Sequence, residues 1–265
     1  MENLDPPVGE SVSPDEGPDF VTALARGLIV MRAFGTGSSR LTLSDIAKQV
    51  GLARATVRRS LITLQAMGYV QSDGRHFSLS PKVLSLGNSY LTSSPLPRVV
   101  QPLLERFAES TRESSWVAIL DEDEALLIAG AKSNRLLAAG LAVGSRLPAY
   151  CTAHGRVLLA GLPDDQLEAY LTRFTPRNYT SRTITEASAI RQVVLEVRST
   201  GYSIADSELE TGLCSIAVPI TDPHGRTLAS VNATAPSGRV SRSEMLERFL
   251  PLLKQIADDV RPELD

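Results

Sequence analysis

The chain has 265 residues, of which 43% are hydrophobic and 22% are charged, an ordinary composition for one large globular domain or two modest ones. No apolar run approaches the roughly 18 residues that a membrane span needs, and the first residues are acidic, so we expect neither a spanning segment nor a secretory signal. Two cysteines, Cys151 and Cys214, cannot form a disulfide framework, and we expect a cytoplasmic protein.

The net charge of −3 conceals an uneven distribution of charge along the chain. Residues 1–19 contain six acidic residues, four prolines and no basic residue, so we predict a disordered acidic tail. Residues 20–82 contain nine basic residues and only two acidic ones. A basic segment of this kind is typical of a protein with a nucleic-acid partner.

A first helix is predicted at the start of the basic segment, from about Phe20 to Phe34. Leu24, Leu28 and Met31 recur at spacings of three and four, and we expect them to form its core-facing stripe. A loop rich in glycine and serine ends this helix.

Two further helices follow at close spacing. The second has Thr42 or Ser44 as a candidate N-cap and ends at Gly51, which can adopt a positive φ. The third extends from about Arg54 to Met67. The apolar residues that we expect it to bury are Val57, Leu61 and Leu64.

Two short strands, Tyr69-Val70 and His76–Leu79, are predicted around a turn at Ser72-Asp73-Gly74. Two helices, a short turn, a third helix and a hairpin form a winged helix-turn-helix, which we assign to residues 20–80. In such a domain the third helix enters the major groove of DNA, and the hairpin reaches an adjacent groove or phosphate.

Basic and small polar residues lie where this domain would face DNA. The side chains that we expect to contact DNA are Arg26, Thr42, Ser44, Arg54, Thr56, Arg58, Arg59, Arg75 and His76. The alternative is a basic helix surface that only faces water. The small residues at positions 53, 55 and 56 favour contact because they permit close approach to the duplex.

Residues 81–95 are predicted to form a linker helix, and residues 96–265 a second domain. Its strands arrive in consecutive groups, which favours an α+β fold with a mainly antiparallel sheet. The predicted strands are 116–120, 125–131, 135–141, 202–206, 214–221 and 227–235. The predicted helices are one marked by Leu103, Leu104, Phe107 and Ala108, and then 153–161, 164–172, 187–200 and 241–260.

An enzyme is one possible function of the second domain. Cys151, His154 and Cys214, with Asp206 or Glu208, resemble a thiol–imidazole–carboxylate set, and Cys151-x-x-His154 resembles half of a zinc site. No second cluster and no known catalytic or phosphate-binding motif accompanies them. We therefore expect no catalytic residues, no metal and no cofactor, and the alternative is a metabolite-processing enzyme with a basic accessory domain.

A binding pocket is the interpretation that the residues favour. Thr152 is a plausible N-cap, which would leave the backbone N–H groups of Ala153, His154 and Gly155 free to bind a carboxylate. In the predicted strand 227–235, polar residues recur at a spacing of two and therefore share one face. Those residues are Ser230, Asn232 and Thr234. The alternative is that Thr152 only caps the helix and that the strand residues only face water.

These motifs together resemble the IclR family of bacterial transcriptional regulators. In the first domain the matching segments are Arg26-Gly27-Leu28, Thr42–Ala47, Thr56–Arg59 and Gly68-Tyr69-Val70. In the second they are Gly144–Pro148, Ala153–Ala160, Gly201-Tyr202-Ser203, Asp206-Ser207-Glu208 and Ile216–Ile220. The segment Tyr150–Ala160 is most similar to the PcaR, PcaU and PobR subgroup, which controls protocatechuate and β-ketoadipate pathway genes.

The resemblance implies a GAF-like domain that binds a small carboxylate, and a homodimer or homotetramer on a palindromic operator. The effector residues that we expect, from the resemblance and the pattern together, are Tyr150, Thr152, Ala153, His154, Asp206, Cys214, Ser215, Asn232 and Thr234. The chain departs from the glyoxylate regulators of the family at Ala205, Ser215 and His154. These differences favour a larger aromatic or dicarboxylic ligand, with His154 or Arg156 as a partner for its carboxylate; the alternative for Arg156 is a structural role.

Overall fold

The computed structural model describes residues 19–35, 39–133 and 140–264. The chain divides into two compact units, one ending at Tyr90 and the other beginning at Leu91. The two units have separate hydrophobic cores.

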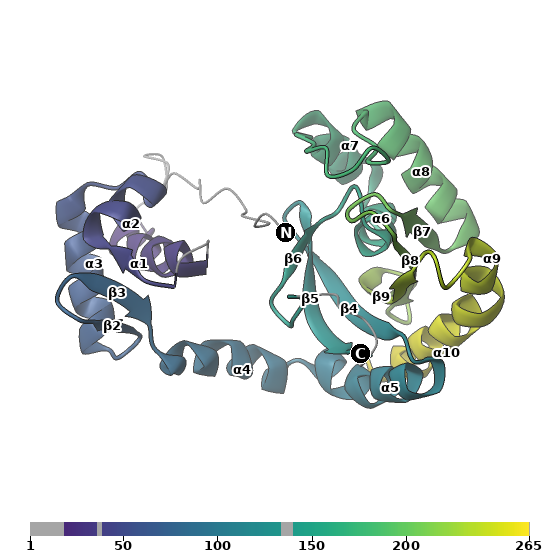
Figure 1. Ribbon diagram of the computed structural model, residues 1–265, viewed down its shortest axis with the longest axis horizontal. Helices are drawn as coiled ribbons and strands as arrows, with labels where there is room; N and C mark the ends of the chain where they lie inside the picture. The colour runs from purple at the N-terminus through teal and green to yellow at the C-terminus, as the bar shows by residue number, and fades with distance from the viewer. Residues whose placement is uncertain (1–18, 36–38, 134–139, 265) are drawn as a thin grey trace. The chain divides into compact units, whose positions relative to one another are not determined.

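The first unit is a small helical domain with a three-stranded antiparallel sheet of strand order β1-β3-β2 (Figure 1). Its elements are α1 (Thr22–Arg32), a 3₁₀ turn (Ala33–Gly35), β1 (Leu41–Thr42), α2 (Leu43–Val50), α3 (Arg54–Ala66), β2 (Val70–Ser72) and β3 (His76–Leu79). A second 3₁₀ turn (Pro81–Val83) and α4 (Leu84–Ser93) follow. The helix-turn-helix and the hairpin predicted from the sequence are therefore present.

The predicted ends of α2 are confirmed. Thr42 is the N-cap, and its hydroxyl and the Asp45 carboxylate each accept a backbone N–H of the other residue, at 3.3 Å and 2.9 Å. Gly51 ends the helix with a φ of 66°, a left-handed conformation that favours glycine.

The predicted apolar stripe of α1 is wrong at its two leucines, whereas Met31 packs against the core. Leu24 and Leu28 are 63% and 51% exposed, whereas Val30 and Ala33 are fully buried. Two apolar rows compete on this helix, and the row that includes Val30 and Ala33 packs in the core with α3. The leucine row is left on the surface.

The second unit is built on a six-stranded, wholly antiparallel sheet of strand order β6-β5-β4-β9-β8-β7. The strands are β4 (Ser114–Asp121), β5 (Glu124–Ala131), β6 (Arg146–Pro148), β7 (Ser203–Asp206), β8 (Leu213–Thr221) and β9 (Thr227–Pro236). The helices are α5 (Pro95–Thr111), α6 (Ala153–Ala160), α7 (Asp164–Thr172), α8 (Ala187–Thr200), α9 (Arg242–Glu244) and α10 (Leu250–Val260). The predicted α+β class is confirmed.

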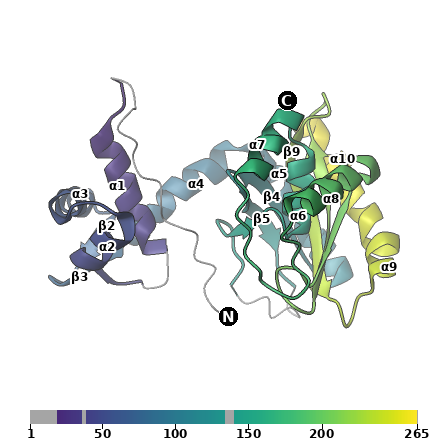
Figure 2. The ribbon, with the colours of Figure 1, turned by 90° about the horizontal axis from the view of Figure 1, so that it is seen from above.

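Helices cover both faces of this sheet (Figures 1 and 2). α5 and α10 pack on one face and enclose the largest core cluster. α6 packs directly on the other face, and α8 packs on α6. The space between α6 and the sheet is where the pocket described below lies.

Three details of the second unit differ from the sequence-based expectation. The predicted strand 135–141 falls mostly outside the described residues, and Gly140 and Leu141 are not in a strand. The three-residue strand β6 was not predicted. The final helix is interrupted by a π-helical turn at Met245–Phe249, next to Pro251, which has no backbone N–H to donate.

Candidate functional site

α3 presents a basic face opposite its buried face. Val57, Leu61 and Leu64 are buried, while Arg54, Arg58 and Arg59 are exposed. None of these three guanidinium groups forms an ion pair or a hydrogen bond with another described residue. The N-terminal half of α3 thus offers unpaired positive charge to a polyanion.

The tip of the β2–β3 hairpin is organised by Asp73. Its carboxylate accepts the backbone N–H groups of Arg75 and His76 at 2.9 and 2.7 Å and also pairs with Arg40. These hydrogen bonds, and the positive charge of Arg40, hold the pKa of Asp73 at about 2. Arg75 is exposed at the tip, whereas the ring of His76 lies 3.5 Å from the Asp73 carboxylate.

The other residues expected at DNA have varied surroundings. Ser44 is exposed and Thr56 is half-buried. The Thr42 hydroxyl is engaged with Asp45 at the start of α2. Arg26 is half-buried, and its Nε is enclosed without a hydrogen-bond partner in the described part of the chain. The structure therefore leaves Arg26 less open to phosphate than the α3 arginines.

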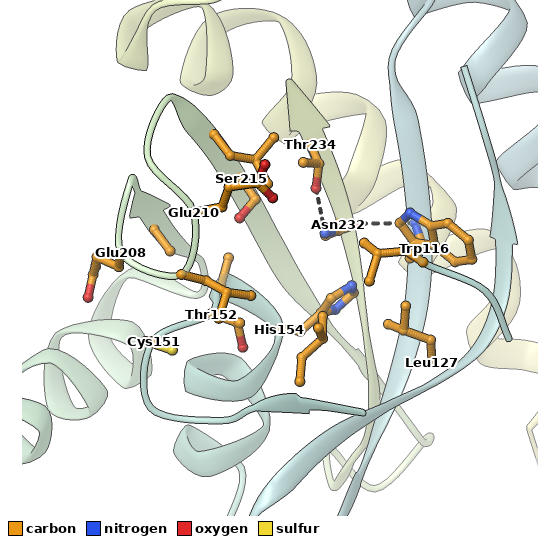
Figure 3. Close-up of a pocket in the computed structure, with 16 residues that line it drawn as sticks. Trp116, Leu127, Cys151, Thr152, His154, Glu208, Glu210, Ser215, Asn232 and Thr234 are labelled. Carbon is orange, nitrogen blue, oxygen red and sulfur yellow. Dashed lines mark hydrogen bonds between the residues drawn. The ribbon is translucent and has the colours of Figure 1, made fainter. Parts of the chain in front are cut away.

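A pocket lies between the first turn of α6 and strands of the sheet (Figure 3). Its cavity volume is about 50 Å³. Its walls are largely apolar, and its polar groups lie on α6, β8 and β9 and on the loop between β7 and β8, which contributes Glu208 and Glu210. The apolar lining residues are Trp116, Leu127, Leu141, Leu147, Leu209 and Leu213.

His154 is the most unusual polar residue of this pocket. It is 2% exposed, its Nδ1 lies 2.6 Å from the Ser230 hydroxyl, and its Nε2 is buried without a hydrogen-bond partner in the described residues. Burial lowers the pKa of His154 to about 3, so the ring is uncharged at neutral pH. A buried polar atom of this kind costs about 1–3 kcal/mol unless a partner satisfies it.

Asn232 and Thr234 form the polar floor of the pocket, as expected from their spacing on β9. Asn232 Oδ1 accepts the backbone N–H of Trp116, and its Nδ2 donates to Thr234 Oγ1, both at 2.9 Å (Figure 3). Because the Thr234 oxygen accepts this bond, its own O–H is left to donate elsewhere. Ser215 lines the same end of the pocket.

The first turn of α6 supplies backbone donors. Thr152 caps the helix by accepting the Gly155 N–H at 3.1 Å, so only the N–H groups of Ala153 and His154 remain without a described partner. A Cβ at Gly155 would overlap the backbone of Ala149, so glycine is what lets the helix approach this turn. The predicted cap is present, with two free N–H groups instead of three.

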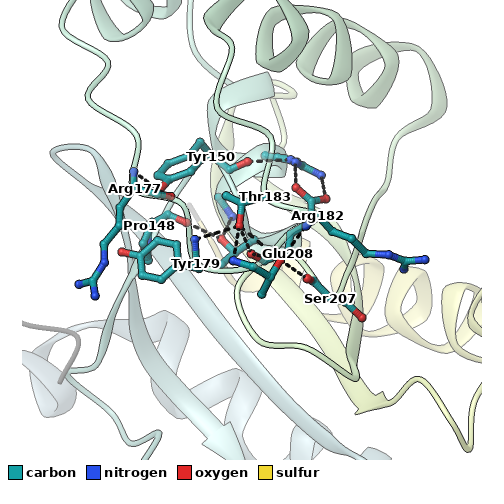
Figure 4. Close-up of polar contacts among 12 residues, drawn as sticks. Pro148, Tyr150, Arg177, Tyr179, Arg182, Thr183, Ser207 and Glu208 are labelled. Carbon is teal, nitrogen blue, oxygen red and sulfur yellow. Dashed lines mark hydrogen bonds and ion pairs between the residues drawn. The ribbon is translucent and has the colours of Figure 1, made fainter. Parts of the chain in front are cut away.

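Three of the expected effector residues do not line this pocket. Asp206 and Cys214 are cross-strand partners, so both face away from the pocket, while the adjacent pair Ala205 and Ser215 faces it. Asp206 pairs with Arg182 at 2.5 Å. Tyr150 is buried beside α6 but directs its hydroxyl to the backbone of Arg177, donating to its oxygen at 2.6 Å and accepting its N–H at 2.8 Å (Figure 4).

Of the two roles left open for Arg156, its contacts show the structural one. It is 2% exposed and forms a two-pronged ion pair with Glu208, with 2.6 Å between Nη1 and Oε1. The hydroxyls of Thr180 and Thr183 donate to the carbonyls of Ser207 and Glu208, both at 2.6 Å, and hold the same loop (Figure 4). Arg156 therefore fastens the loop between β7 and β8 beside the pocket and does not line it.

The apolar wall of the pocket was not predicted. Trp116 and Leu127 belong to strands that were predicted, but only the pairing of those strands shows that both side chains face α6.

Within the described ranges, no three His, Cys, Asp or Glu residues gather as metal ligands would. No described helix is long and apolar enough to cross a membrane.

Two family models match the chain. The IclR helix-turn-helix domain matches residues 23–74, and the bacterial transcriptional regulator IclR C-terminal domain matches residues 88–261. Together the two matches span most of both units.

Named relatives and solved structures agree with these matches. The Pca regulon regulatory protein of Pseudomonas putida is 46% identical over 93% of this chain and 85% of its own length. The structure of a transcriptional regulator, RHA06195, from Rhodococcus sp. RHA1 is 44% identical, with a TM-score of 0.80 over 92% of this chain and 98% of that one. An IclR homologue of Microbacterium hydrocarbonoxydans, complexed with 4-hydroxybenzoate, is 25% identical, with a TM-score of 0.77 over 91% of this chain and 98% of that one.

Proposed function

The chain belongs to the IclR family of bacterial transcriptional regulators, and we propose that it is a cytoplasmic regulator whose affinity for a palindromic operator is set by a small carboxylate bound in its second unit. In this proposal residues 1–19 are an acidic tail, 20–80 bind DNA, 81–95 link the domains and 96–265 bind the effector. Its named relatives are regulators and not enzymes.

The DNA-binding part of the proposal rests on the unpaired arginines of α3. Arg54, Arg58 and Arg59 would enter the major groove, and Arg75 at the hairpin tip would meet phosphate or an adjacent groove. Ser44 and Thr56 would contact the DNA backbone, while Thr42 and His76 would act mainly through their local hydrogen bonds.

A homodimer or homotetramer is supported by apolar surface on α1 and α4. Leu24, Leu28 and Leu84 are 63%, 51% and 74% exposed. Exposed apolar side chains on successive turns of a helix, such as Leu24 and Leu28, are typical of association surfaces, and a second copy of this chain is the partner that a palindromic operator requires. We expect light scattering after size exclusion to give an even number of chains, and aspartate at Leu24 and Leu28 together to reduce that number.

The observation that carries the effector proposal is the partnerless Nε2 of His154 at the polar end of an apolar pocket. In the tautomer in which the Ser230 hydroxyl donates to Nδ1, Nε2 carries the ring proton and, together with the Thr234 O–H and the N–H groups of Ala153 and His154, would offer several donors to one acid group. No unpaired cationic side chain lines the pocket in the described part of the chain, because Arg156 is committed to Glu208.

The apolar walls favour an aromatic acid or a β-ketoadipate-type acid. A benzene-sized ligand occupies an apolar cavity of about 150 Å³, so the present volume of about 50 Å³ requires the walls to move as a ring enters. The homologue complexed with 4-hydroxybenzoate supports this ligand class.

A thermal-shift screen tests the effector proposal directly. A ligand that binds only the folded state raises the melting temperature, by mass action. We expect at least one of 4-hydroxybenzoate, protocatechuate and β-ketoadipate to do so, and acetate, as the control, to have no effect. If none of these acids changes either the melting temperature or binding to promoter fragments from the neighbourhood of the gene, the effector proposal is wrong.

A further inference from the structure

Trp116 forms a wall of the pocket and lies against a glycine. Trp116 on β4 and Gly130 on β5 are opposite each other in the sheet, and Trp116 is 4% exposed. A Cβ on Gly130 would overlap the six-membered ring of Trp116. The indole therefore covers the Gly130 backbone, and a shift of the ring toward β5 displaces that backbone.

The same glycine backbone is held by a side chain of α5. Gln101 Nε2 donates to the Gly130 carbonyl at 3.3 Å, and the Gly130 N–H donates to Gln101 Oε1 at 3.4 Å. In the part of the chain that the structure describes, β5 pairs with β6 only at residues 124–126, and at Gly130 the amide of Gln101 takes the place of a neighbouring strand. Gln101 is thereby a polar attachment between the pocket wall and α5.

The part of β5 between the pocket residue Leu127 and Gly130 is irregular. The pairing of β4 with β5 shifts between Val117 and Ala118, so that Ile128 is an extra residue between Leu127 and Ala129. A β-bulge bends its strand and interrupts the ladder of hydrogen bonds. The bulge lies between two residues that contact the pocket or its wall, Leu127 and Gly130, and it makes this stretch easier to displace than a regular strand.

We propose that Gln101 is the positioning residue that transmits occupancy of the pocket to α5. This inference rests on the proposed function. An effector ring that enters the small cavity displaces Trp116, Trp116 displaces Gly130, and the paired hydrogen bonds make Gln101 follow. α5 begins at Pro95, and only Ser94 separates it from the end of α4, so the displacement reaches the predicted linker through the covalent chain.

The single tryptophan of the sequence makes binding and transmission separately measurable. Because Trp116 lines the pocket, its fluorescence reports ligand binding. The experiment titrates the full-length protein with 4-hydroxybenzoate and, in a separate series, with β-ketoadipate. It also measures operator affinity with and without saturating acid, for the wild type, for Gln101→Leu and for the control Glu109→Gln, an exposed change on the same helix.

The expected result is a separation of the two readouts in Gln101→Leu. The midpoint of its fluorescence titration stays within about twofold of the wild type, while its effector-dependent change in operator affinity falls at least about fivefold. Glu109→Gln retains both properties. A wild-type DNA response in Gln101→Leu overturns the proposal, and so does a loss of ligand binding, because Gln101 would then act on the pocket itself.

A second variant tests transmission without any ligand. In Gly130→Ala the new Cβ displaces the Trp116 ring, so operator affinity without effector changes at least about fivefold, and adding Gln101→Leu removes this change. An operator affinity equal to that of the wild type, in a folded Gly130→Ala protein, overturns the proposal. If the wild type binds neither acid, the effector proposal fails, and the Gly130→Ala comparison still decides whether Gln101 transmits.

Discussion

Acidification provides a direct test of the buried, uncharged His154. Burial lowers the pKa of His154 from 6.5 to about 3 in the folded protein. Below about pH 6.5, His154 therefore binds a proton in the unfolded chain and does not bind one in the folded chain. The free energy of unfolding therefore falls as the pH falls from about 6.5 toward 3. With these two pKa values, His154 lowers it by about 2 kcal/mol between pH 7.5 and pH 5.

His154→Gln isolates this contribution, because glutamine keeps a hydrogen-bonding side chain that does not titrate. Urea unfolding at both pH values, followed by the fluorescence of Trp116, reports the second unit alone. We expect the wild type to lose about 2 kcal/mol more than His154→Gln on acidification. Equal losses in the two proteins would refute the argument, since His154 would then titrate alike in the folded and unfolded states.

Three further predictions concern other residues. Arg58→Ala or Arg59→Ala should weaken specific operator binding about tenfold in gel-shift titrations, and wild-type affinity should fall steeply with salt; unchanged affinity in both variants, or a flat salt response, contradicts the recognition-helix assignment. Replacing Asn232 and Thr234 by leucine should abolish the effector response while operator binding without effector persists, and a surviving response places the ligand elsewhere. Arg156→Met should lower the free energy of unfolding of the second unit by about 3–5 kcal/mol, because it leaves the Glu208 charge buried and unpaired; a loss below about 1 kcal/mol in urea would show that Glu208 is solvated.

Local signals made much of the fold predictable. As the sequence indicated, α2 begins after the Thr42 cap and ends at Gly51, which is left-handed. The polar residues of β9 face the pocket, as their spacing of two required. The leucines of α1 were wrongly expected in the core because two apolar rows are compatible with its sequence, and only packing against α3 selects Val30.

The pocket wall needed information that a single sequence does not contain. Asp206 and Cys214 were expected at the pocket because they neighbour Ala205 and Ser215 in the chain, yet strand pairing turns each to the opposite face. Trp116 and Asn232 are hydrogen-bonded although more than a hundred residues separate them in the sequence, and no local pattern predicts that contact. The burial of Arg156 follows from Glu208, whose loop is placed by Thr180 and Thr183.

The ion pair of Arg156 with Glu208 has a consequence for which small anions the proposed effector site would exclude. Cytoplasm is crowded with phosphate, acetate and similar hydrophilic ions, which a free guanidinium would attract with little regard for the rest of the molecule. In the proposed function, the donors of the described lining are uncharged and its charged side chains are the acids Glu208 and Glu210, so such ions would gain too little to replace their hydration, and a carbon skeleton that fits against Trp116 and Leu127 would supply the difference. The proposed site would thus select against small hydrophilic anions, because its described lining offers them no cationic side chain.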